Sequence, residues 1–409
     1  MVLRTLKLPI TINQHMNRNN ILIVLFFLLI ITSYCNGLTK KGGIIGDQSA
    51  DNGNNLSYAE KSKAVYDLIV QKYWDAKTGF FHENYPAKSD DKKACYLWSY
   101  VGVVSGTNTM MRIGYSQQEL LPVVDGFANF LDPRFPAGYA SYPVSLGHDT
   151  RFYDDNAITG IELVDAFQIS GDKKYLEQAE LAMDFIMTGE DTTCGGGVLW
   201  NETEGKGVGE KGISANGFSV YLALKLYQIN NKKLYLDYAN RIYKWVKTNL
   251  QNPDNLIYWN GIYVKDCSVN KAIWTYNTAI MILNDIEFYK LTNDKSFLKD
   301  ASQMGASSYK DFTSQVDGML FYTTHDTWFN TVLLKAYIEL TKYDDKAKQY
   351  VETFIENADY AWEHARNQYG LFYEDWSGKS PGRDQWLLHE ACLIEVYGRI
   401  ALYRNEKVH

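Results

Sequence analysis

The chain has 409 residues, enough for one large domain or two ordinary ones, and 46% of them are apolar and 22% charged, as in a globular protein. The formal net charge is −7, which argues against binding to nucleic acid or another polyanion. Aromatic residues reach 14%, with 31 Tyr and 10 Trp, whose flat apolar faces and polar edges suit sugar rings as well as a large core.

The first predicted element is an export signal over residues 1–37. A basic stretch precedes an apolar run at residues 21–31, which is too short to span a membrane comfortably, and small and polar residues follow. Cys35 closely follows this run, as in a bacterial lipoprotein signal with a lipidated cysteine, and ordinary cleavage after Gly37 is the alternative. We therefore expect an exported protein, either anchored by lipid at the cell surface or in the periplasm, or secreted. Residues 38–55 are predicted to form a flexible tether.

Six copies of a short phrase organise the rest of the chain, residues 56–409. Each begins with Gly, or once with Asn, and continues with apolar and aromatic residues and then polar ones, as in "GVLWNET". The copies begin at Gly79, Gly138, Gly197, Asn255, Gly318 and Gly370, at spacings of 59, 59, 58, 63 and 52 residues. Because Gly and Asn tolerate positive φ and aromatic residues favour strands, each phrase predicts a turn with a short extended segment.

Helical patterns fill the intervals between the phrases, with apolar residues recurring at three and four. Amphipathic helices precede the phrases, as at 63–74, 174–187 and 348–365. Helices that are apolar nearly all round, and therefore buried, follow the phrases, as at 217–227, 278–289 and 389–403. Six such pairs predict an all-α fold, an (α/α)6 barrel in one catalytic domain, with short aromatic hairpin loops at one end around a cleft. A linear solenoid of six units is the alternative.

Every phrase leads into the start of a buried helix, so the six helix starts should meet at the cleft. These starts are residues 95–100, 154–158, 211–216, 273–277, 325–329 and 383–389. One of them carries two adjacent aspartates, Asp154 and Asp155. A single aspartate there would be explained as an N-cap that the helix dipole favours. Two carboxyls at a cleft are what glycoside hydrolysis requires at the scissile bond.

Five motifs occur together and in order: "YDDNA" at 153–157, "CGGGVLWN" at 194–201, "EKGISANG" at 210–217, "WTYNTA" at 274–279 and "HDTWFNTVLLKAYIEL" at 325–340. They resemble glycoside hydrolase family 76, the endo-α-1,6-mannanase family, and the similarity extends over residues 58–404. The resemblance implies an (α/α)6 barrel that cleaves α-mannan with retention of configuration, with Asp154 as nucleophile and Asp155 as acid/base. The segment "AITGIEL" after the pair departs from family members, which often carry aromatic residues there.

Further residues at the helix starts and phrases are candidate sugar contacts. The candidates for hydrogen bonds to hydroxyls are Asn216, Tyr276, Asn277 and Asp326, and those for stacking on mannose rings are Trp98, Trp200, Trp274 and Trp328. Each has a structural alternative, because Asn277 and Asp326 could cap their own helices and a tryptophan is more often part of a core. The mechanism needs no metal, and no cofactor is expected.

The four cysteines after Cys35 are far apart and lack the spacing of a zinc site. In an exported chain they predict one or two disulfides, and the sequence leaves the pairing open. The leading hypothesis is a retaining, endo-acting α-1,6-mannanase, which we expect to be a monomer. The alternatives are a mannan transglycosylase and a surface glycan-binding protein that has kept the cleft without turnover, although retention of both Asp154 and Asp155 argues against the latter.

Overall fold

The computed structural model describes residues 56–147, 149–204, 208–323, 327–380 and 385–408. The predicted signal and tether, with Cys35, lie outside these residues, and so does Asp326. Within the described parts, no helix is both long and apolar enough to span a bilayer.

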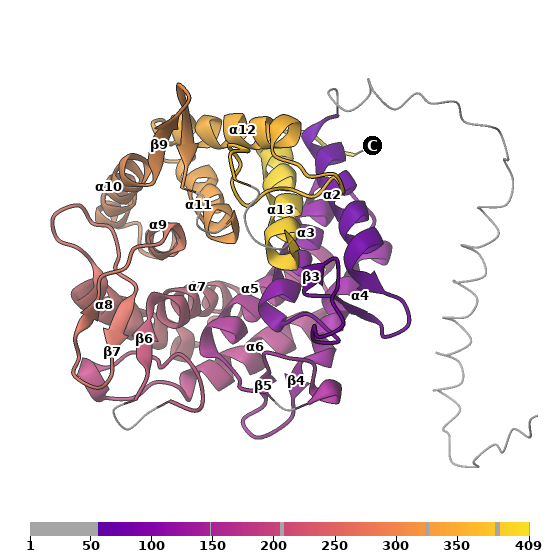
Figure 1. The fold of residues 1–409 in the computed structure, drawn as a ribbon. Coiled ribbons are helices and arrows are strands. Elements are labelled where there is room, and N and C mark those ends of the chain that lie inside the picture. Colours follow the sequence, from indigo (N-terminus) through magenta and orange to yellow (C-terminus); the bar gives the residue numbers. More distant parts are fainter. Residues whose placement is uncertain (1–55, 148, 205–207, 324–326, 381–384, 409) are drawn as a thin grey trace, which may run out of the picture. The chain divides into compact units, whose positions relative to one another are not determined.

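Two concentric rings of helices form the barrel (Figure 1). The inner ring consists of α3 (Leu97–Ile113), α5 (Tyr153–Ser170), α7 (Ile213–Asn230), α9 (Thr275–Thr292), α11 (Thr327–Leu340) and α13 (Leu387–Tyr403). The outer ring consists of α2 (Tyr58–Tyr73), α4 (Gln117–Asp125), α6 (Lys173–Met187), α8 (Lys233–Leu250), α10 (Lys295–Asp311) and α12 (Ala347–His364). Outer and inner helices alternate along the chain, as the six-fold repeat predicts.

The last helix, α13, closes the inner ring. It packs against α3, the first inner helix, and on its other side against α11. The short strand β11 (Gln385–Trp386) also pairs antiparallel with β3 (Asn84–Tyr85), which joins the last connector to the first. The predicted (α/α)6 barrel is therefore confirmed, and the open solenoid is wrong because the first and last units cover each other.

Burial explains why the two rings differ in sequence. Every residue of α9 from Thr275 to Phe288 is buried. In contrast, α8 buries one stripe that includes Tyr235, Tyr238 and Ile242. An inner helix is surrounded by other helices, whereas an outer helix has neighbours on one side and water on the other, so only the outer ring is amphipathic.

Three very short turns connect the rings where the inner helices finish, at what we call the turn end. Gly171, Asn231 and Asn293 terminate α5, α7 and α9 with φ of 73°, 56° and 57°. This left-handed conformation suits glycine and asparagine. Asp172 and Asp294 then cap α6 and α10 by accepting hydrogen bonds from backbone N–H groups at 3.0 and 2.9 Å.

Longer connectors lie where the inner helices begin, at what we call the cleft end. Their strands are β1 (Trp74–Asp75), β2 (Phe80–Phe81), β4 (Leu131–Asp132), β5 (Gly138–Tyr139), β6 (Glu210–Gly212), β7 (Gly261–Tyr263), β8 (Val269–Asn270), β9 (Thr313–Val316) and β10 (Met319–Tyr322). Short 3₁₀ turns occur at Gly126–Asn129, Val144–Leu146 and Thr193–Gly195. The strands pair antiparallel as β1–β2, β4–β5, β6–β7–β8 and β9–β10.

Amide and carboxylate side chains on three inner helices accept hydrogen bonds from the backbone of the preceding connectors. In each case the fourth residue of the helix accepts from a connector N–H: Asn156 from Tyr139 at 2.7 Å, Asn216 from Val198 at 2.7 Å and Glu390 from Phe372 at 2.9 Å. We call these three side chains the latch residues. They fix the connectors relative to the helix starts, because a buried N–H group left without a partner would be costly.

A disulfide joins Cys194, in the connector before α7, to Cys267, in the hairpin of β7 and β8. This is the pairing that the sequence left open, and Cys95 and Cys392 are buried free thiols. The bridge ties two neighbouring connectors together at the cleft end.

Candidate active site

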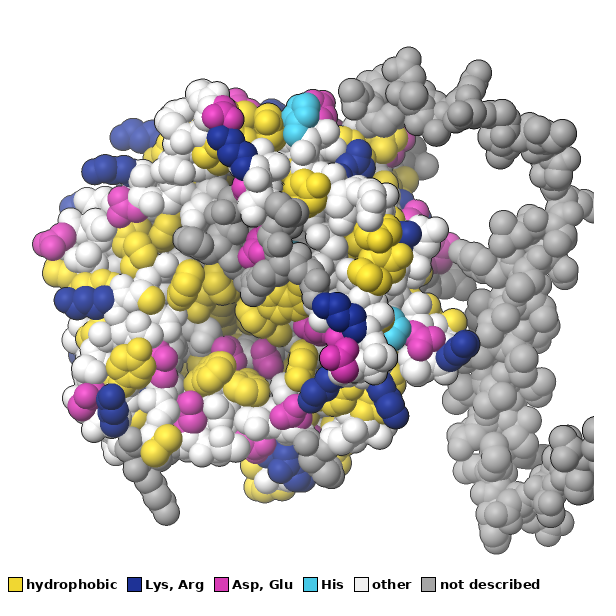
Figure 2. Space-filling model, in the orientation of Figure 1, with side chains coloured by type: hydrophobic (Ala, Val, Ile, Leu, Met, Phe, Trp, Pro, Cys, Tyr) yellow, Lys and Arg dark blue, Asp and Glu magenta, His cyan; other side chains and the backbone are white. Residues whose placement is uncertain are grey.

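A cleft with a volume of about 600 Å³ opens at the starts of the inner helices. Figure 2 shows this face of the molecule hollowed, with hydrophobic and acidic side chains gathered around the hollow. The second residue of each of five inner helices, α3, α5, α7, α9 and α11, lines the cleft: Trp98, Asp154, Ser214, Tyr276 and Trp328. Equivalent positions of the repeat therefore meet at one cavity.

Hydrogen bonds hold the carboxyl group of Asp154. Its Oδ2 accepts from Nε1 of Trp200 at 2.8 Å, and its Oδ1 accepts from the backbone N–H of Asp155 at 2.9 Å. The side chain of Ser214 also donates to this carboxyl. Burial raises the pKa of Asp154 to about 6, and these hydrogen bonds limit the rise because they favour the ionised form.

The carboxyl group of Asp155 lies in a different environment. Burial raises the pKa of Asp155 well above its usual value, and the negative charge of Asp154 raises it further. Two like charges this close titrate as a pair, so ionisation of one opposes ionisation of the other. The geometry therefore favours a carboxylate at Asp154 beside a carboxylic acid at Asp155.

Aromatic rings form much of the cleft wall. Trp98 packs edge to face on Trp328, with 5.8 Å between the ring centroids. The ring centroids of Tyr276 and Phe329 are 4.5 Å apart. Trp200 is 44% exposed, so part of its ring is open to a ligand while its N–H group bonds Asp154. Rings of this kind offer apolar faces to the C–H surfaces of sugars.

Three of the predicted sugar contacts do not line the cleft. Asn216 is fully buried, and its amide bonds the backbone N–H and carbonyl of Val198. Asn277 is also fully buried, with Nδ2 3.4 Å from the carbonyl of Tyr258. Trp274 precedes α9 and lines a separate hollow of about 170 Å³. These placements correct the predicted roles, because the two amides serve the protein backbone and the indole faces another cavity.

The cleft also contains residues that the sequence did not single out: Asp149, Glu210, Ser214, Asn260 and Phe329. Oε1 of Glu210 accepts hydrogen bonds from the amides of Asn260 at 2.8 Å and Asn270 at 3.1 Å, which fix its position. Glu210 and Ser214 stand in the motif "EKGISANG". Ser214 is the second residue of α7, and the predicted helix start at residues 211–216 does not identify that position.

The described residues contain no cluster of three or more His, Cys, Asp or Glu side chains that could hold a metal ion. What the cleft does bring together is a carboxylate, a carboxylic acid and several aromatic faces. Such a set can deliver a nucleophile and a proton to one glycosidic bond while a sugar ring is held by stacking.

Solved structures with the same fold include enzymes that act on α-mannan. The GH76 α-mannanase BT2949 of Bacteroides thetaiotaomicron superposes with a TM-score of 0.77 at 25% identity, over 86% of this chain and 97% of that chain. The α-1,6-mannanase GH76A of Salegentibacter sp. HEL1_6 was solved with α-1,6-mannotetrose as an inactive variant in which two consecutive aspartates are replaced. It superposes with a TM-score of 0.72 at 19% identity, over 85% of this chain and 100% of that chain.

Curated relatives match a shorter part of the chain. The mannan endo-1,6-alpha-mannosidase DCW1 of Candida glabrata is 29% identical over 157 residues, which is 35% of this chain and 35% of that protein. The corresponding protein of Candida albicans is 24% identical over 185 residues, 42% of this chain and 41% of that protein. The chain thus matches less than half the length of these relatives. The model of glycosyl hydrolase family 76 matches residues 57–397, and the chain belongs to this family of glycoside hydrolases.

Proposed function

We propose that this chain is a retaining, endo-acting α-1,6-mannanase with Asp154 as nucleophile and Asp155 as general acid/base. The observation that carries the proposal is the unequal environment of the two neighbours. Hydrogen bonds from Trp200 and Ser214 favour the ionised form of Asp154, whereas burial and the charge of Asp154 favour the protonated form of Asp155. A retaining glycosidase needs one carboxyl group in each of these states.

In the first step, a carboxylate oxygen of Asp154 bonds to the anomeric carbon while the bond from that carbon to the glycosidic oxygen breaks. Asp155 transfers its proton to the departing oxygen, so the leaving sugar carries a hydroxyl group and Asp155 becomes a carboxylate. Asp154 is now an uncharged ester. The repulsion that held the proton on Asp155 has gone, and Asp155 can act as a base.

In the second step, Asp155 takes a proton from water. The water oxygen bonds to the anomeric carbon as the ester bond to Asp154 breaks, which regenerates both side chains. Two displacements at one carbon leave its configuration unchanged.

The substrate class is inferred from the relatives and from the cleft. A structural neighbour binds α-1,6-mannotetrose, and the curated relatives are named mannan endo-1,6-alpha-mannosidases. Trp98, Trp200 and Trp328 in the cleft provide aromatic faces for a chain of pyranose rings. These observations support α-1,6-mannan as the substrate.

Incubation with debranched α-1,6-mannan and with branched mannan, followed by separation of products by size, tests the proposal. An endo-acting hydrolase releases a series of short oligosaccharides, an exo-acting one releases only mannose, and a transglycosylase forms products longer than its substrate. NMR of the first product should show the α-anomer. A β-anomer would overturn retention, and no product from either polymer would overturn mannan hydrolysis.

The two roles are separated by substitution. Asp155→Ala should recover turnover on a substrate with a good leaving group, which needs little protonation, and added azide should give a glycosyl azide of retained configuration. Asp154→Ala should show no such rescue, since no other group attacks the anomeric carbon. Rescue of Asp154→Ala in place of Asp155→Ala would reverse the assignment.

We also propose that the chain is exported and carries lipid on Cys35. The disulfide between Cys194 and Cys267 supports export, because such bonds persist in oxidising compartments. A fatty-acid analogue should label the wild type and not Cys35→Ser. If both forms are instead released equally into the medium, ordinary secretion is favoured.

A further inference from the structure

Two short backbone segments meet next to the acid pair. Residues 151–153, immediately before Asp154, pair antiparallel with residues 200–202 of the next connector. Phe152 stands opposite Asn201, flanked by two backbone hydrogen bonds of 2.9 and 3.1 Å. The segment that leads into Asp154 and the connector that carries Trp200 are thereby set in one register.

This register decides whether Trp200 can reach Asp154. The hydrogen bond from Nε1 of Trp200 to Oδ2 of Asp154 is 2.8 Å long. Successive side chains of an extended segment point to opposite sides, so a slip of one residue would turn the indole away from the carboxylate. Trp200 is 44% exposed, and its ring packs on that of Phe152 with 4.9 Å between the ring centroids. Because Phe152 belongs to the paired segment, this contact depends on the same register.

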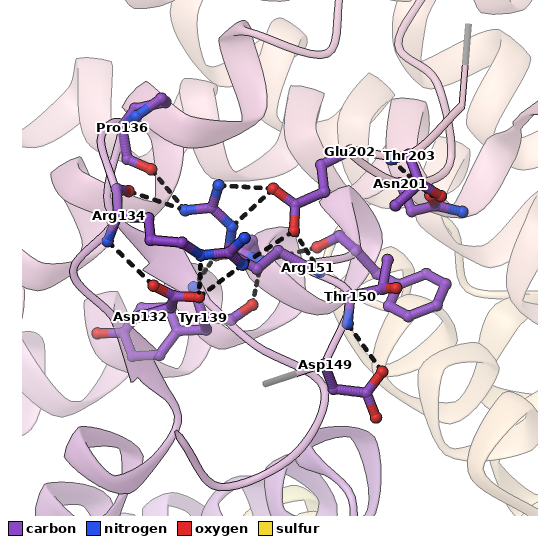
Figure 3. A network of polar contacts seen from close by, with 12 residues as sticks. Asp132, Arg134, Pro136, Tyr139, Asp149, Thr150, Arg151, Asn201, Glu202 and Thr203 are labelled. Atoms are coloured by element: carbon purple, nitrogen blue, oxygen red, sulfur yellow. Dashed lines mark hydrogen bonds and ion pairs between the residues drawn. The ribbon is translucent and has the colours of Figure 1, made fainter. Parts of the chain in front are cut away.

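An ion pair spans the two segments (Figure 3). Arg151 is only 5% exposed, and its Nε and Nη2 donate to Oε2 of Glu202 at 2.9 and 2.6 Å. Its Nη1 donates to the carbonyls of Arg134 and Pro136 at 3.0 and 2.6 Å. The backbone N–H of Arg151 donates to Oε1 of Glu202 at 3.2 Å.

A second arginine extends the network to the hairpin of β4 and β5. Nη2 of Arg134 donates to Oε1 of Glu202 at 3.2 Å, and its Nε donates to Oδ2 of Asp132 at 2.7 Å. Burial acts to raise the pKa of Glu202, but hydrogen bonds and charge from Arg151 outweigh it and lower the pKa. Three segments of the cleft end are thus joined through one carboxylate that stays ionised.

We infer that the Arg151–Glu202 pair is a positioning device that holds the Trp200 indole against the Asp154 carboxylate. The inference rests on the proposed function, since it assigns a role toward the same nucleophile. A buried ion pair is a poor way to gain stability alone, because desolvation cancels much of the attraction. It does fix direction, because the planar guanidinium forks onto one carboxylate and two carbonyls at once.

Arg151→Lys and Glu202→Gln test the inference, with Trp200→Phe as the reference for a lost hydrogen bond. Each should lower kcat on α-1,6-mannan by about 10- to 100-fold with KM within about twofold, since a displacement of about 1 Å can cost 10²-fold. The acid limb of kcat/KM should move to higher pH in all three variants, because the Trp200 hydrogen bond favours ionised Asp154. The double variant Arg151→Lys/Trp200→Phe should be no slower than the slower single variant.

The matched control is Arg404→Lys in the exposed Arg404–Glu352 pair, which should leave kcat and the pH profile unchanged. The other titratable residues that line the cleft are Tyr96, Asp149, Asp155, Glu210 and Tyr276, and every variant retains them. The inference is overturned if Arg151→Lys and Glu202→Gln lower only the melting temperature. It is also overturned if the loss in the double variant equals the product of the two single losses. Should Arg151→Lys not fold, Glu202→Gln carries the same test.

A readout without turnover separates this inference from the proposed function. NMR titration of ¹³C-labelled aspartate carboxyls should show Asp154 titrating at higher pH in Glu202→Gln and in Trp200→Phe than in the wild type. An unchanged titration in Glu202→Gln overturns the positioning role. Failure of the wild type to cleave mannan would overturn the proposed substrate while this comparison still stands.

Discussion

Acidic side chains at the two ends of α5 have pKa values that are shifted in opposite directions. At the cleft end, Asp154 and Asp155 have raised pKa values, and neither lysine nor arginine is among the described residues that line the cleft. At the turn end of the same helix, Oδ1 of Asp165 lies 3.2 Å from Nη2 of Arg112. Burial acts to raise the pKa of Asp165, but the charges of Lys335 and Arg112 outweigh it and lower the pKa.

Several cations gather around one hollow at the turn end. A hollow of about 440 Å³ there is lined by Arg112, Lys225, Lys290, Lys335, Lys342 and Arg399. Such residues are favoured near helix C-termini, where the free carbonyl groups carry partial negative charge. The comparison shows that burial alone does not produce a protonated carboxyl group. At the cleft end the pKa values rise because none of the described residues that line the cleft is a lysine or arginine that would offset burial.

The largest expected difference between the two ends is in turnover. Asp154→Ala should lower kcat on α-1,6-mannan by at least about 10³-fold, because the attacking group is lost. Asp165→Ala, an identical change on the same helix, should keep kcat within about threefold and lower the melting temperature by a few degrees, as expected for a lost ion pair of a partly buried group. Equal losses of turnover in the two variants would contradict the comparison.

The pH dependence of the wild type sharpens the same contrast. Since burial raises the pKa of Asp154 to about 6, its nucleophilic form is lost as the pH falls through that value. Below it, kcat/KM should drop about tenfold per pH unit, and it should drop again at higher pH when Asp155 gives up its proton. Initial rates on a soluble mannan oligosaccharide check this. Activity that stays constant down to about pH 4, where an exposed aspartate titrates, would show that the nucleophile is not buried as described.

A smaller effect is expected on stability from the latch residues. Asn216→Ala leaves the buried N–H and carbonyl of Val198 without partners, so the free energy of unfolding should fall by about 3 kcal/mol. Asn230→Ala, at the turn end, removes an amide that bonds Glu180 in a half-buried position, where water can replace it, and should cost about 1 kcal/mol. Urea unfolding of both variants measures the difference. An equal loss of unfolding free energy in the two variants would mean that the latch residues do not hold the connectors.

The smallest effect is expected in the turns themselves. Asn231 ends α7 with φ of 56°, a conformation that glycine also adopts without strain. Asn231→Gly should therefore change the free energy of unfolding by less than about 0.5 kcal/mol, whereas Asn231→Ala should lower it by about 1 kcal/mol. Thermal unfolding of the pair is sufficient, and a larger loss with glycine than with alanine would contradict this account of the turn end.

The barrel and the acid pair could be predicted because their signals are local in the chain. The repeated phrase and the contrast between amphipathic and uniformly apolar helices can be read in single windows of sequence, and both follow from which helices are surrounded. Asp154 and Asp155 stand together at one helix start, so their placement at the cleft followed from the repeat.

The remaining site residues depend on helix rotation, which the apolar pattern leaves undetermined by a residue or two at each end. Trp98 is the second residue of α3 and faces the cleft, whereas Trp274 stands one residue before α9 and faces another hollow. In α7, Ser214 and Asn216 are two positions apart, about 200° around the axis, so one lines the cleft and the other serves as a latch. The disulfide pairing depends in turn on which connectors become neighbours.

The placement of cleft residues and latch residues on opposite sides of the inner helices has an evolutionary consequence. Replacing the second residue of a helix alters the surface that a sugar meets and leaves the anchor of the connector intact. Selectivity for differently decorated polysaccharides can therefore diverge within an unchanged scaffold. For the same reason, a combinatorial library at Ser214, with the acid pair held constant, should yield mostly folded proteins. Tyr276 and Trp328 are only 7% and 5% exposed, so they should accept only side chains of similar size.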